Sequence, residues 1–288
     1  LDGSSAASDV YKRQSLYKLE TKMVAVAESM SGEQVRSLCR TSAFTEPTSG
    51  AARGYVQCNI VILPAEIAKS FEDFCRLNPK PCPLLATSPT PGDPSLPALG
   101  TNIDIRYDIP RYRIWQKGAL AEHRLHIAEL WRDDFVAFAL GCSFSFEEAL
   151  LNAGIEVRNI SEGVNVPMFR TNLDCTPAGI FRAKMVVSMR PMPPAQAIEA
   201  IQICSRYPSV HGAPIHFGDA SQLGIEDLSQ PDFGDPVSLN EDDVPVFWAC
   251  GVTPQVALEN AQPALAITHE PGHMLVTDLK NVDLAEDR

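Results

Sequence analysis

Two short turns carry the side chains that are best suited to chemistry. Residues 141–145 read Gly-Cys-Ser-Phe-Ser, and residues 249–253 read Ala-Cys-Gly-Val-Thr. Each turn joins an apolar run to a segment with helical spacing, so Cys142, Ser143 and Cys250 are expected at helix N-termini, where free amides and the helix dipole favour an anion. Thiols and hydroxyls placed there can act as nucleophiles, acids or oxyanion donors. Neither turn reads Gly-x-Ser-x-Gly, so the hydrolase serine nucleophile is not indicated.

The residues after the first turn predict a capped helix. Ser145 and Glu148 have the spacing of a capping box, and Gly154 marks the end of the helix. Thr253 takes the place of Ser145 in the second turn, with Pro254 at the first helical position. Buried structural thiols are the plainer interpretation of both cysteines. From the two turns we therefore select three catalytic candidates and two substrate-binding candidates: Cys142, Ser143 and Cys250, and Ser145 and Thr253.

The two turns belong to longer segments that resemble each other. Residues 133–153 align without gaps on residues 241–261, and seven of the 21 positions are identical, including Cys142 with Cys250. This similarity predicts an internal duplication of a strand-Cys-turn-helix unit, with the two halves facing each other across one site. Chance similarity of two ordinary turns is the alternative.

A loop rich in glycine and proline contains two histidines. Residues 210–219 read VHGAPIHFGD, which places His211 and His216 close to Asp219. Such loops commonly carry functional residues, and imidazole is the usual general acid or base near neutral pH. We predict His211 or His216 as the catalytic proton carrier. Solvated histidines and a metal site formed with Asp219 are the alternatives, and no metal or cofactor is predicted.

One segment matches the sequence of a zinc-protease motif but not the helical structure that the motif requires. Residues 269–273 read HEPGH, which matches His-Glu-x-x-His. That chemistry needs both histidines on one face of a continuous helix, and Pro271 with Gly272 between them prevents the helix. We reject a metalloprotease and retain His269 as a substrate-binding candidate on a loop.

Two arginines follow apolar stretches, where a guanidinium requires a carboxylate partner. Arg170 lies in VPMFRTN together with Asn172, and Arg190 lies in VVSMRPMP. Binding of a substrate carboxylate and a structural ion pair are equally weighted explanations. All three residues are substrate-binding candidates.

Composition restricts the class of protein. The 288 residues carry a formal charge of −12, and 45% of them are hydrophobic, which indicates a globular chain without a nucleic-acid surface. No apolar run reaches the roughly 18 residues of a membrane span. The eight cysteines contain no C-x-x-C pair, which is typical of reduced thiols in the cytoplasm, or in the mitochondrial matrix of a eukaryote. The expected partner is a small carboxylate substrate, and a homo-oligomer is left open.

Strands alternate with helices along the chain, which predicts a mixed α/β (α+β) protein of two domains. Pro79 to Gly100 is a proline-rich connection. The run 128–141 is a helix or a buried strand, and 155–160 is expected to be a strand. The larger α/β domain is expected to comprise 23–145 plus 225–288, and the smaller α+β domain 146–224.

The first residues are expected to be foreign to the fold. Asp9 to Gln14 (DVYKRQ) can be encoded by a transposon-end adapter used in sequencing libraries. We therefore infer that residues 1–14 are a translated adapter and that the natural chain starts near Met23 or Met30.

Several stretches together resemble one known family, the D-glutamate cyclases and their bacterial relatives with hydro-lyase names. The resemblance covers about residues 31–279 and rests on these segments in order: GYVQCNIVILP, NPKPCPLL, LWRDDFVAFALGCSFSFEEAL, NVPMFRTN, VVSMRPMP, SRYPSVHGAPIHFGD, PDFGDPV, VPVFWACGVTPQ and THEPGHMLVTDL. Cys58 stands where a small residue such as alanine is expected. The resemblance carries over no residue role.

The resemblance implies a two-domain α/β fold and conversion of D-glutamate to 5-oxo-D-proline with loss of water. In that reaction the helix N-termini would bind the oxyanion, a loop histidine would move the proton, and an arginine would hold the α-carboxylate. One alternative is a hydro-lyase that dehydrates another small hydroxy or amino acid. The other is a carboxylate-binding protein without turnover.

Overall fold

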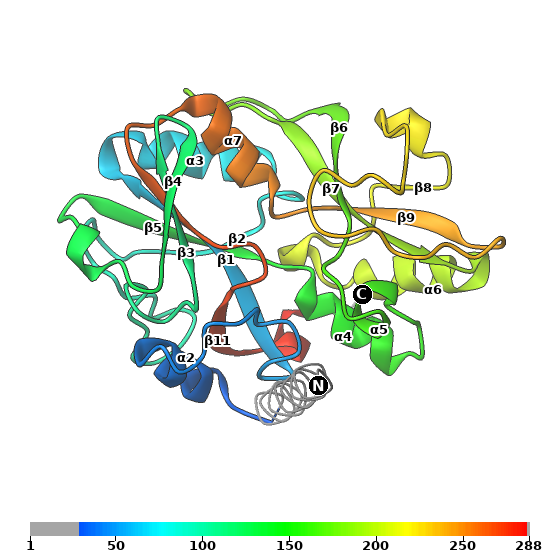
Figure 1. Cartoon of the computed structure of the whole chain (residues 1–288), viewed down its shortest axis with the longest axis horizontal. Helices are drawn as coiled ribbons and strands as arrows, with labels where there is room; N and C mark the ends of the chain where they lie inside the picture. The colour runs from blue at the N-terminus through cyan, green and yellow to red at the C-terminus, as the bar shows by residue number, and fades with distance from the viewer. Residues whose placement is uncertain (1–28, 287–288) are drawn as a thin grey trace, which may run out of the picture.

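The computed structural model describes residues 29–286. The predicted adapter segment, residues 1–14, and Met23 lie outside the described residues. Two β-sheets with helices packed against them form two lobes that lie side by side (Figure 1). The mixed α/β class predicted from the sequence is confirmed.

The first sheet has seven strands and is centred on β1, whose residues are buried almost throughout. Its order is β2-β5-β1-β10-β3-β4, and β11 also pairs with β1. The strands are β1 (Tyr55–Pro64), β2 (Leu84–Thr87), β3 (Tyr112–Gln116), β4 (Ala119–Arg124), β5 (Phe135–Gly141), β10 (Ala266–His269) and β11 (Leu275–Lys280). Burial on both faces explains why β1 reads as an apolar, β-branched run rather than an alternating one.

The second sheet has four strands in the order β6-β7-β9-β8. They are β6 (Met168–Asp174), β7 (Lys184–Met192), β8 (His216–Phe217) and β9 (Val244–Ala249). Neighbouring strands in both sheets pair antiparallel. Because β9 pairs with β7, the second sheet extends past the domain boundary that we predicted after residue 224.

Six α-helices and four short 3₁₀ segments surround the sheets within residues 29–286. The α-helices are α2 (Gly32–Arg40), α3 (Ala65–Leu77), α4 (Phe144–Asn152), α5 (Arg158–Ser161), α6 (Pro194–Cys204) and α7 (Thr253–Ala261). The 3₁₀ segments are η1 (Ala128–Leu130), η2 (Pro208–Val210), η3 (Ala220–Leu223) and η4 (Asn281–Leu284). At the start of α2, Ser31 and Gln34 form a capping box.

The chain contains the same series of elements twice. One series is β1-α3-β2-β5-α4, with strands β3 and β4 inserted between β2 and β5, and the other is β7-α6-β8-β9-α7. In each series the first strand runs through a proline, Pro64 or Pro193, directly into a helix. The strand orders also correspond, because β2-β5-β1-β10 in one sheet matches β8-β9-β7-β6 in the other. The predicted strand-turn-helix unit therefore occurs in both halves, at β5-α4 and β9-α7.

The two halves exchange a helix and a strand. The strand that follows α4 is β6, in the second sheet, and the strand that follows α7 is β10, in the first sheet. Phe146 of α4 shares a core cluster with Cys204 of α6, whereas Leu258 of α7 shares one with Phe71 and Phe74 of α3. Each sheet is thus completed by the other half of the chain.

Some local predictions were wrong. The segment expected as a strand at 155–160 leads into α5, and the predicted capping box at the start of α4 does not form. Ser143, not Ser145, precedes α4, and Glu148 accepts a hydrogen bond from Asn281 (2.7 Å) instead of reaching back along the helix. The ambiguous run 128–141 begins with η1 and ends in strand β5.

Candidate functional site

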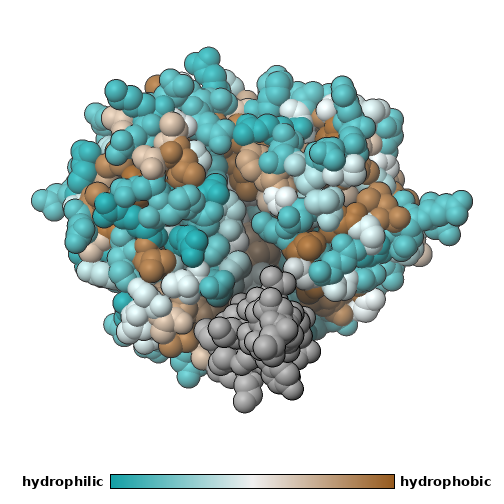
Figure 2. All heavy atoms as spheres, viewed as in Figure 1, coloured by the Kyte–Doolittle hydropathy of each residue, from teal (hydrophilic) through white to brown (hydrophobic). Residues whose placement is uncertain are grey.

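The two turns identified in the sequence line one cavity between the lobes. Of the residues selected from sequence, five line it: Cys142, Ser143, His211, Cys250 and His269. Asn59 on β1 and Ser188 on β7 also line the cavity. In the space-filling view a furrow runs between the lobes, with hydrophobic residues on its walls (Figure 2).

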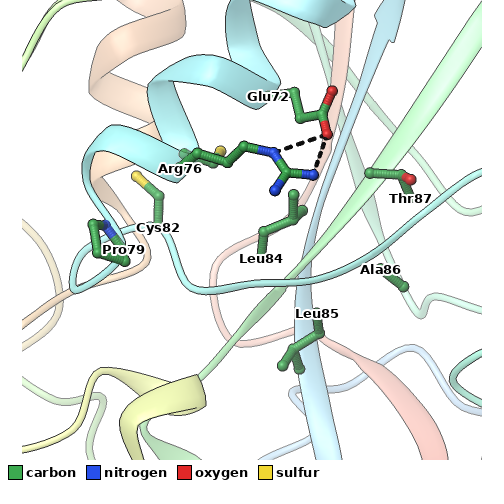
Figure 3. A pocket seen from close by; sticks show the side chains of 9 residues that line it. Glu72, Arg76, Pro79, Cys82, Leu84, Leu85, Ala86 and Thr87 are labelled. Carbon is green, nitrogen blue, oxygen red and sulfur yellow. Dashed lines mark hydrogen bonds and ion pairs between the residues drawn. The ribbon is translucent and has the colours of Figure 1, made fainter.

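A second hollow lies on the outer side of α3 and is larger, at about 710 Å³ against about 480 Å³, both including space open to solvent. An ion pair between Glu72 and Arg76 (2.6 Å) spans it, one helical turn apart (Figure 3). The two charged groups satisfy each other, and the candidate residues lie elsewhere. We therefore place the functional site in the cavity between the lobes.

The two cysteines at the turns are neutral thiols. Burial raises the pKa of Cys142 to about 12 and that of Cys250 to about 11. This corrects the lowered pKa that a helix N-terminus alone would produce, because loss of hydration opposes the thiolate. Nucleophilic thiolate chemistry is therefore not favoured at either turn.

His211 enters the cavity from the loop after α6, with its ring held by one backbone contact. Its Nδ1 lies 2.7 Å from the carbonyl oxygen of Lys80. A carbonyl only accepts, so Nδ1 carries the proton and Nε2 carries the lone pair of the neutral ring. The backbone of His211 has φ 81°, a left-handed conformation that a histidine adopts only when its surroundings require it.

His269, the last residue of β10, is held by both backbone groups of one residue. Its Nδ1 lies 3.1 Å from the N–H nitrogen of Ile60 and 3.3 Å from the Ile60 carbonyl oxygen. An amide N–H only donates and a carbonyl only accepts, so the first contact goes with a ring proton on Nε2 and the second with a ring proton on Nδ1. Within residues 29–286 neither Nε2 has a hydrogen-bond partner.

Both rings are uncharged at neutral pH. Burial lowers the pKa of His211 to about 4 and that of His269 to about 4. The cavity is therefore lined by two neutral imidazoles, of which His211 has the lone pair on Nε2 and His269 can present an Nε2–H when its Nδ1 accepts from Ile60. Together they are an acid–base pair suited to moving a proton between two atoms of one ligand.

Arg190 lies behind the cavity wall and not in it. Its side chain is fully buried and paired with Glu147, and its Nη2 donates to Ser143 Oγ (3.1 Å) while its Nη1 donates to Ser188 Oγ (3.0 Å). The rings of Phe146 and Trp248 lie over the guanidinium, each with its centroid at 5.3 Å. The structure thus gives Arg190 an ion pair and two serine partners.

Sequence reasoning missed Asn59 and Ser188. Asn59 Nδ2 donates to the carbonyl oxygen of Gly141 (3.0 Å) at the end of β5. Gly251, at the second turn, lies so close that a Cβ there would be 2.4 Å from Asn59 Nδ2. Polar residues inside largely apolar strands were the available signal, because burial makes such residues costly unless they have partners.

Five other candidates lie outside the cavity lining. Thr253 Oγ1 accepts from Val186 N (3.0 Å), so this hydroxyl ties α7 to β7, and Ser145 is buried within α4. Arg170 pairs with Glu259 (3.0 Å) and Asn172 donates to the carbonyl of Gln222 (3.2 Å), both at exposed positions. His216 contacts the carbonyl of its neighbour Asp219 (2.9 Å).

The described part of the chain has no group of three or more His, Cys, Asp and Glu side chains that could hold a metal ion. His211 and His216 therefore do not form the metal site considered with Asp219. The rejection of a HEPGH helix is confirmed, because β10 ends at His269 and a turn follows. Within residues 29–286, no helix is both long and apolar enough to cross a membrane.

The cavity-forming part of the chain matches a known family. The model of the family described as D-glutamate cyclase matches residues 136–278. A protein of Bordetella petrii named "putative hydro-lyase" is 54% identical over 263 residues, which is 91% of this chain and 99% of that protein. One of the same name from Rhizobium johnstonii is 56% identical over 250 residues, 87% of this chain and 93% of that protein.

This chain belongs to the D-glutamate cyclase family. The resemblance noted from the sequence is thereby confirmed. The family match includes both turns and both cavity histidines. Among solved structures, a nitrogen repressor-like protein of Methanococcus jannaschii matches with a TM-score of 0.32 and 10% identity over 85% of this chain and 97% of that one. A likeness this weak carries no argument.

Proposed function

We propose that this member of the D-glutamate cyclase family is a water-releasing lyase that converts D-glutamate to 5-oxo-D-proline. The observation that carries the proposal is the pair of buried, neutral histidines that line one cavity. Ring closure needs one group that takes protons from nitrogen and another that stabilises charge on oxygen. The family match supports the lyase class, and the hydro-lyase names of the relatives agree with it.

Ring closure begins at the ammonium group of glutamate, which must lose a proton before the nitrogen can attack the γ-carboxyl carbon. His211 Nε2 is the acceptor, because its lone pair faces the cavity while Nδ1 is bound to the Lys80 carbonyl. The pKa of about 4 belongs to the free protein. A carboxylate bound beside the ring favours the imidazolium and raises that pKa, so ligand binding itself strengthens the base.

Attack on the γ-carboxyl carbon forms the C–N bond and places negative charge on the carboxyl oxygens. His269 Nε2–H, the Ser143 hydroxyl and the amides at the N-termini of α4 and α7 can donate toward such an oxyanion. When the C–O bond breaks, the departing oxygen needs two protons to leave as water. The nitrogen loses two protons on becoming the lactam N–H, so the protons balance and the protein ends the cycle unchanged.

Incubation of the protein with D-glutamate and with L-glutamate tests the proposal, with 5-oxoproline resolved by chiral chromatography. We expect 5-oxo-D-proline from the D isomer and far less product from the L isomer. Absence of lactam from both isomers would overturn the cyclase activity.

Dehydration of another small hydroxy or amino acid is the second candidate, and the hydro-lyase names of the relatives favour it. The same histidine pair could remove a proton from carbon and protonate a leaving hydroxyl. The product would then be an alkene that absorbs in the ultraviolet. A screen of small hydroxy acids followed by absorbance separates this activity from lactam formation.

A further inference from the structure

Arg190 is a fully buried cation whose donors are directed to three groups. Its Nε donates to Glu147 Oε1 (3.1 Å), its Nη1 to Ser188 Oγ (3.0 Å) and its Nη2 to both Glu147 and Ser143 Oγ (3.1 Å). Glu147 belongs to α4, Ser188 to β7 and Ser143 to the turn before α4. One guanidinium therefore fixes two serines that come from different halves of the chain and line the same cavity.

The direction of these hydrogen bonds determines whether the two serine hydroxyls can donate to a ligand. A guanidinium has no acceptor atom, so each serine oxygen must accept from Arg190. Each hydroxyl then keeps its own proton for another acceptor, and the hydrogen bond from a cation polarises the O–H further. The Cys142 thiol beside Ser143 is a neutral and weak acceptor. The cavity is where an acceptor for both protons can bind.

The chemistry of the surrounding lining favours an anion as that acceptor. Of the residues described, those that line the cavity include no Asp, Glu, Lys or Arg. The buried cation and the carboxylate of Glu147 compensate each other behind the wall. The N-terminus of α4 lies at Ser143 and Phe144, where free amides and the helix dipole add a positive potential.

We propose that Ser143 and Ser188 form a carboxylate-binding subsite whose two O–H donors are positioned by Arg190. The inference rests on the proposed function, which it deepens by naming the part of the cavity that holds a carboxylate of the substrate. Arg190 is a positioning residue because it reaches the ligand only through the serines.

The second half of the chain lacks the equivalent of Ser143 and Glu147. The proposed subsite therefore lies at one end of the cavity only. At the second turn Gly251 replaces Ser143 and Gln255 replaces Glu147, by the same alignment that pairs Cys142 with Cys250. The place of a serine hydroxyl there is filled by the close approach of Gly251 to Asn59.

The test measures binding of glutarate, which has the two carboxylates of glutamate but no amine and cannot cyclise. Calorimetric titration of S143A and S188A is expected to show affinity reduced by about 10- to 100-fold in each case, the effect of losing a hydrogen bond to a charged group. R190K is expected to weaken binding by a similar factor. In the S143A/S188A background R190K should change affinity by less than about twofold, because coupled residues are not additive.

Arg158 supplies the matched control. It is also a buried arginine that bonds a carboxylate, Asp243 (3.2 Å), and a serine hydroxyl, Ser238 (3.3 Å), but it does not line the cavity. R158K should leave glutarate affinity unchanged. Equal losses from R190K with and without the serines would show a structural role and overturn the positioning by Arg190.

The carboxylate subsite and the cyclase activity can fail separately. Glutarate binding that depends on both serines, in a protein that forms no lactam, would retain the subsite and remove the reaction. Unchanged affinity in S143A and S188A, or no binding of glutarate to the wild-type protein, would overturn the subsite whatever the reaction.

Discussion

His211 and His269 are both buried and uncharged, but the backbone holds their rings differently. Nδ1 of His211 has one backbone partner, the carbonyl oxygen of Lys80, so the ring proton is on Nδ1. Nδ1 of His269 lies near both the N–H and the carbonyl oxygen of Ile60, so its ring proton can be directed to the carbonyl or to the cavity. Two chemically identical side chains are therefore held in different ways in one cavity.

Replacement of His211 by asparagine tests its role as the base. Asparagine tolerates the left-handed backbone of this position better than most residues do, and its amide can still donate to Lys80. We expect H211N to lower kcat for lactam formation by about 10²- to 10⁴-fold, the usual contribution of a general base. H216N changes the other loop histidine, which lies outside the cavity lining, and should keep near wild-type kcat. The reverse pattern would move the base to His216.

The neutral histidines also predict how stability depends on pH. In the unfolded chain each ring titrates near pH 6.5, whereas burial lowers the pKa to about 4 in the fold. Below pH 6.5 the unfolded state therefore binds protons that the folded state does not, and the free energy of unfolding falls as the pH falls toward 4. Above pH 6.5 the two histidines are neutral in both states, so this loss of stability is absent.

Urea unfolding at pH 7.5 and at pH 5.0 measures this effect. The midpoint of the wild-type protein should be lower at pH 5.0, and the double variant H211N/H269N should lose much of that difference. An equal drop in both proteins would assign the pH dependence to other groups, such as the buried carboxylates.

For individual residues, the sequence predicted which side chains line the cavity better than it predicted the contacts that they make. Cys142, Ser143, Cys250, His211 and His269 were found because two turns and two loops were recognisable in the letters, and all five line the cavity. The position of Arg190 behind the cavity wall could not be predicted from the sequence. Its partner Glu147 lies 43 residues away, and the contact depends on packing between the halves. Tautomers depend on individual backbone contacts and were equally inaccessible.

The two turns are alike as elements but are anchored differently. The turn before α4 is held through Ser143 by Arg190, whereas the turn before α7 is held by Thr253, whose hydroxyl accepts from the backbone of Val186 on β7. The Thr253 hydroxyl is thus occupied by the fold. We therefore expect it to contribute to stability rather than to ligand binding.

Replacement of Thr253 by valine separates these two roles. The variant keeps the shape of the side chain but leaves the buried Val186 N–H without its acceptor, which should lower the free energy of unfolding by about 1–3 kcal/mol. The KM of the folded protein should stay near that of the wild type. T253S retains the hydroxyl and should retain most of the stability. A large rise in KM for T253V without loss of stability would instead show that Thr253 binds the substrate.

Elements with strong periodicity were predictable, and those defined by contacts were not. Strand β1 and helices α3, α6 and α7 follow from apolar runs and from prolines at their boundaries. The capping box expected at Ser145 failed because the helix starts at Phe144 with Ser143 before it, two residues earlier than the serine pattern indicated. A local pattern predicts that a helix begins, but tertiary contacts select the residue at which it does.

The exchange of elements between the halves joins the two sheets into one folding unit. β6 completes the second sheet after α4, and β10 completes the first sheet after α7, so neither sheet can be lost without removing a strand that belongs to the other half. We therefore expect a single cooperative transition despite the two lobes.

Tryptophans placed in each sheet make this expectation measurable. Trp115 lies on β3 of the first sheet, and Trp248 lies on β9 of the second. One variant keeps only Trp115, and the other keeps only Trp248, with phenylalanine at the remaining tryptophan positions. Within each variant, the urea transition followed by fluorescence should coincide with the transition followed by far-ultraviolet circular dichroism. A fluorescence transition displaced from the circular dichroism curve of the same variant would show that the sheets unfold separately.

The exchange itself could not be predicted from the sequence. The alignment of the two turns indicated duplicated halves, and the alternation of strands with helices indicated the α/β class. Long-range strand pairing determines which sheet β6 and β10 join. The local sequence of neither strand indicates the sheet to which it belongs. The domain boundary after residue 224 was drawn without that information, and β9 lies beyond it.

The exchange builds the cavity from both halves of the chain, yet its two ends are not alike. One end has Ser143 and Ser188, both bonded to Arg190, and the other has Gly251 and Asn59. Two hydroxyl donors are therefore present at one end only, so a ligand whose two ends differ would bind in one orientation.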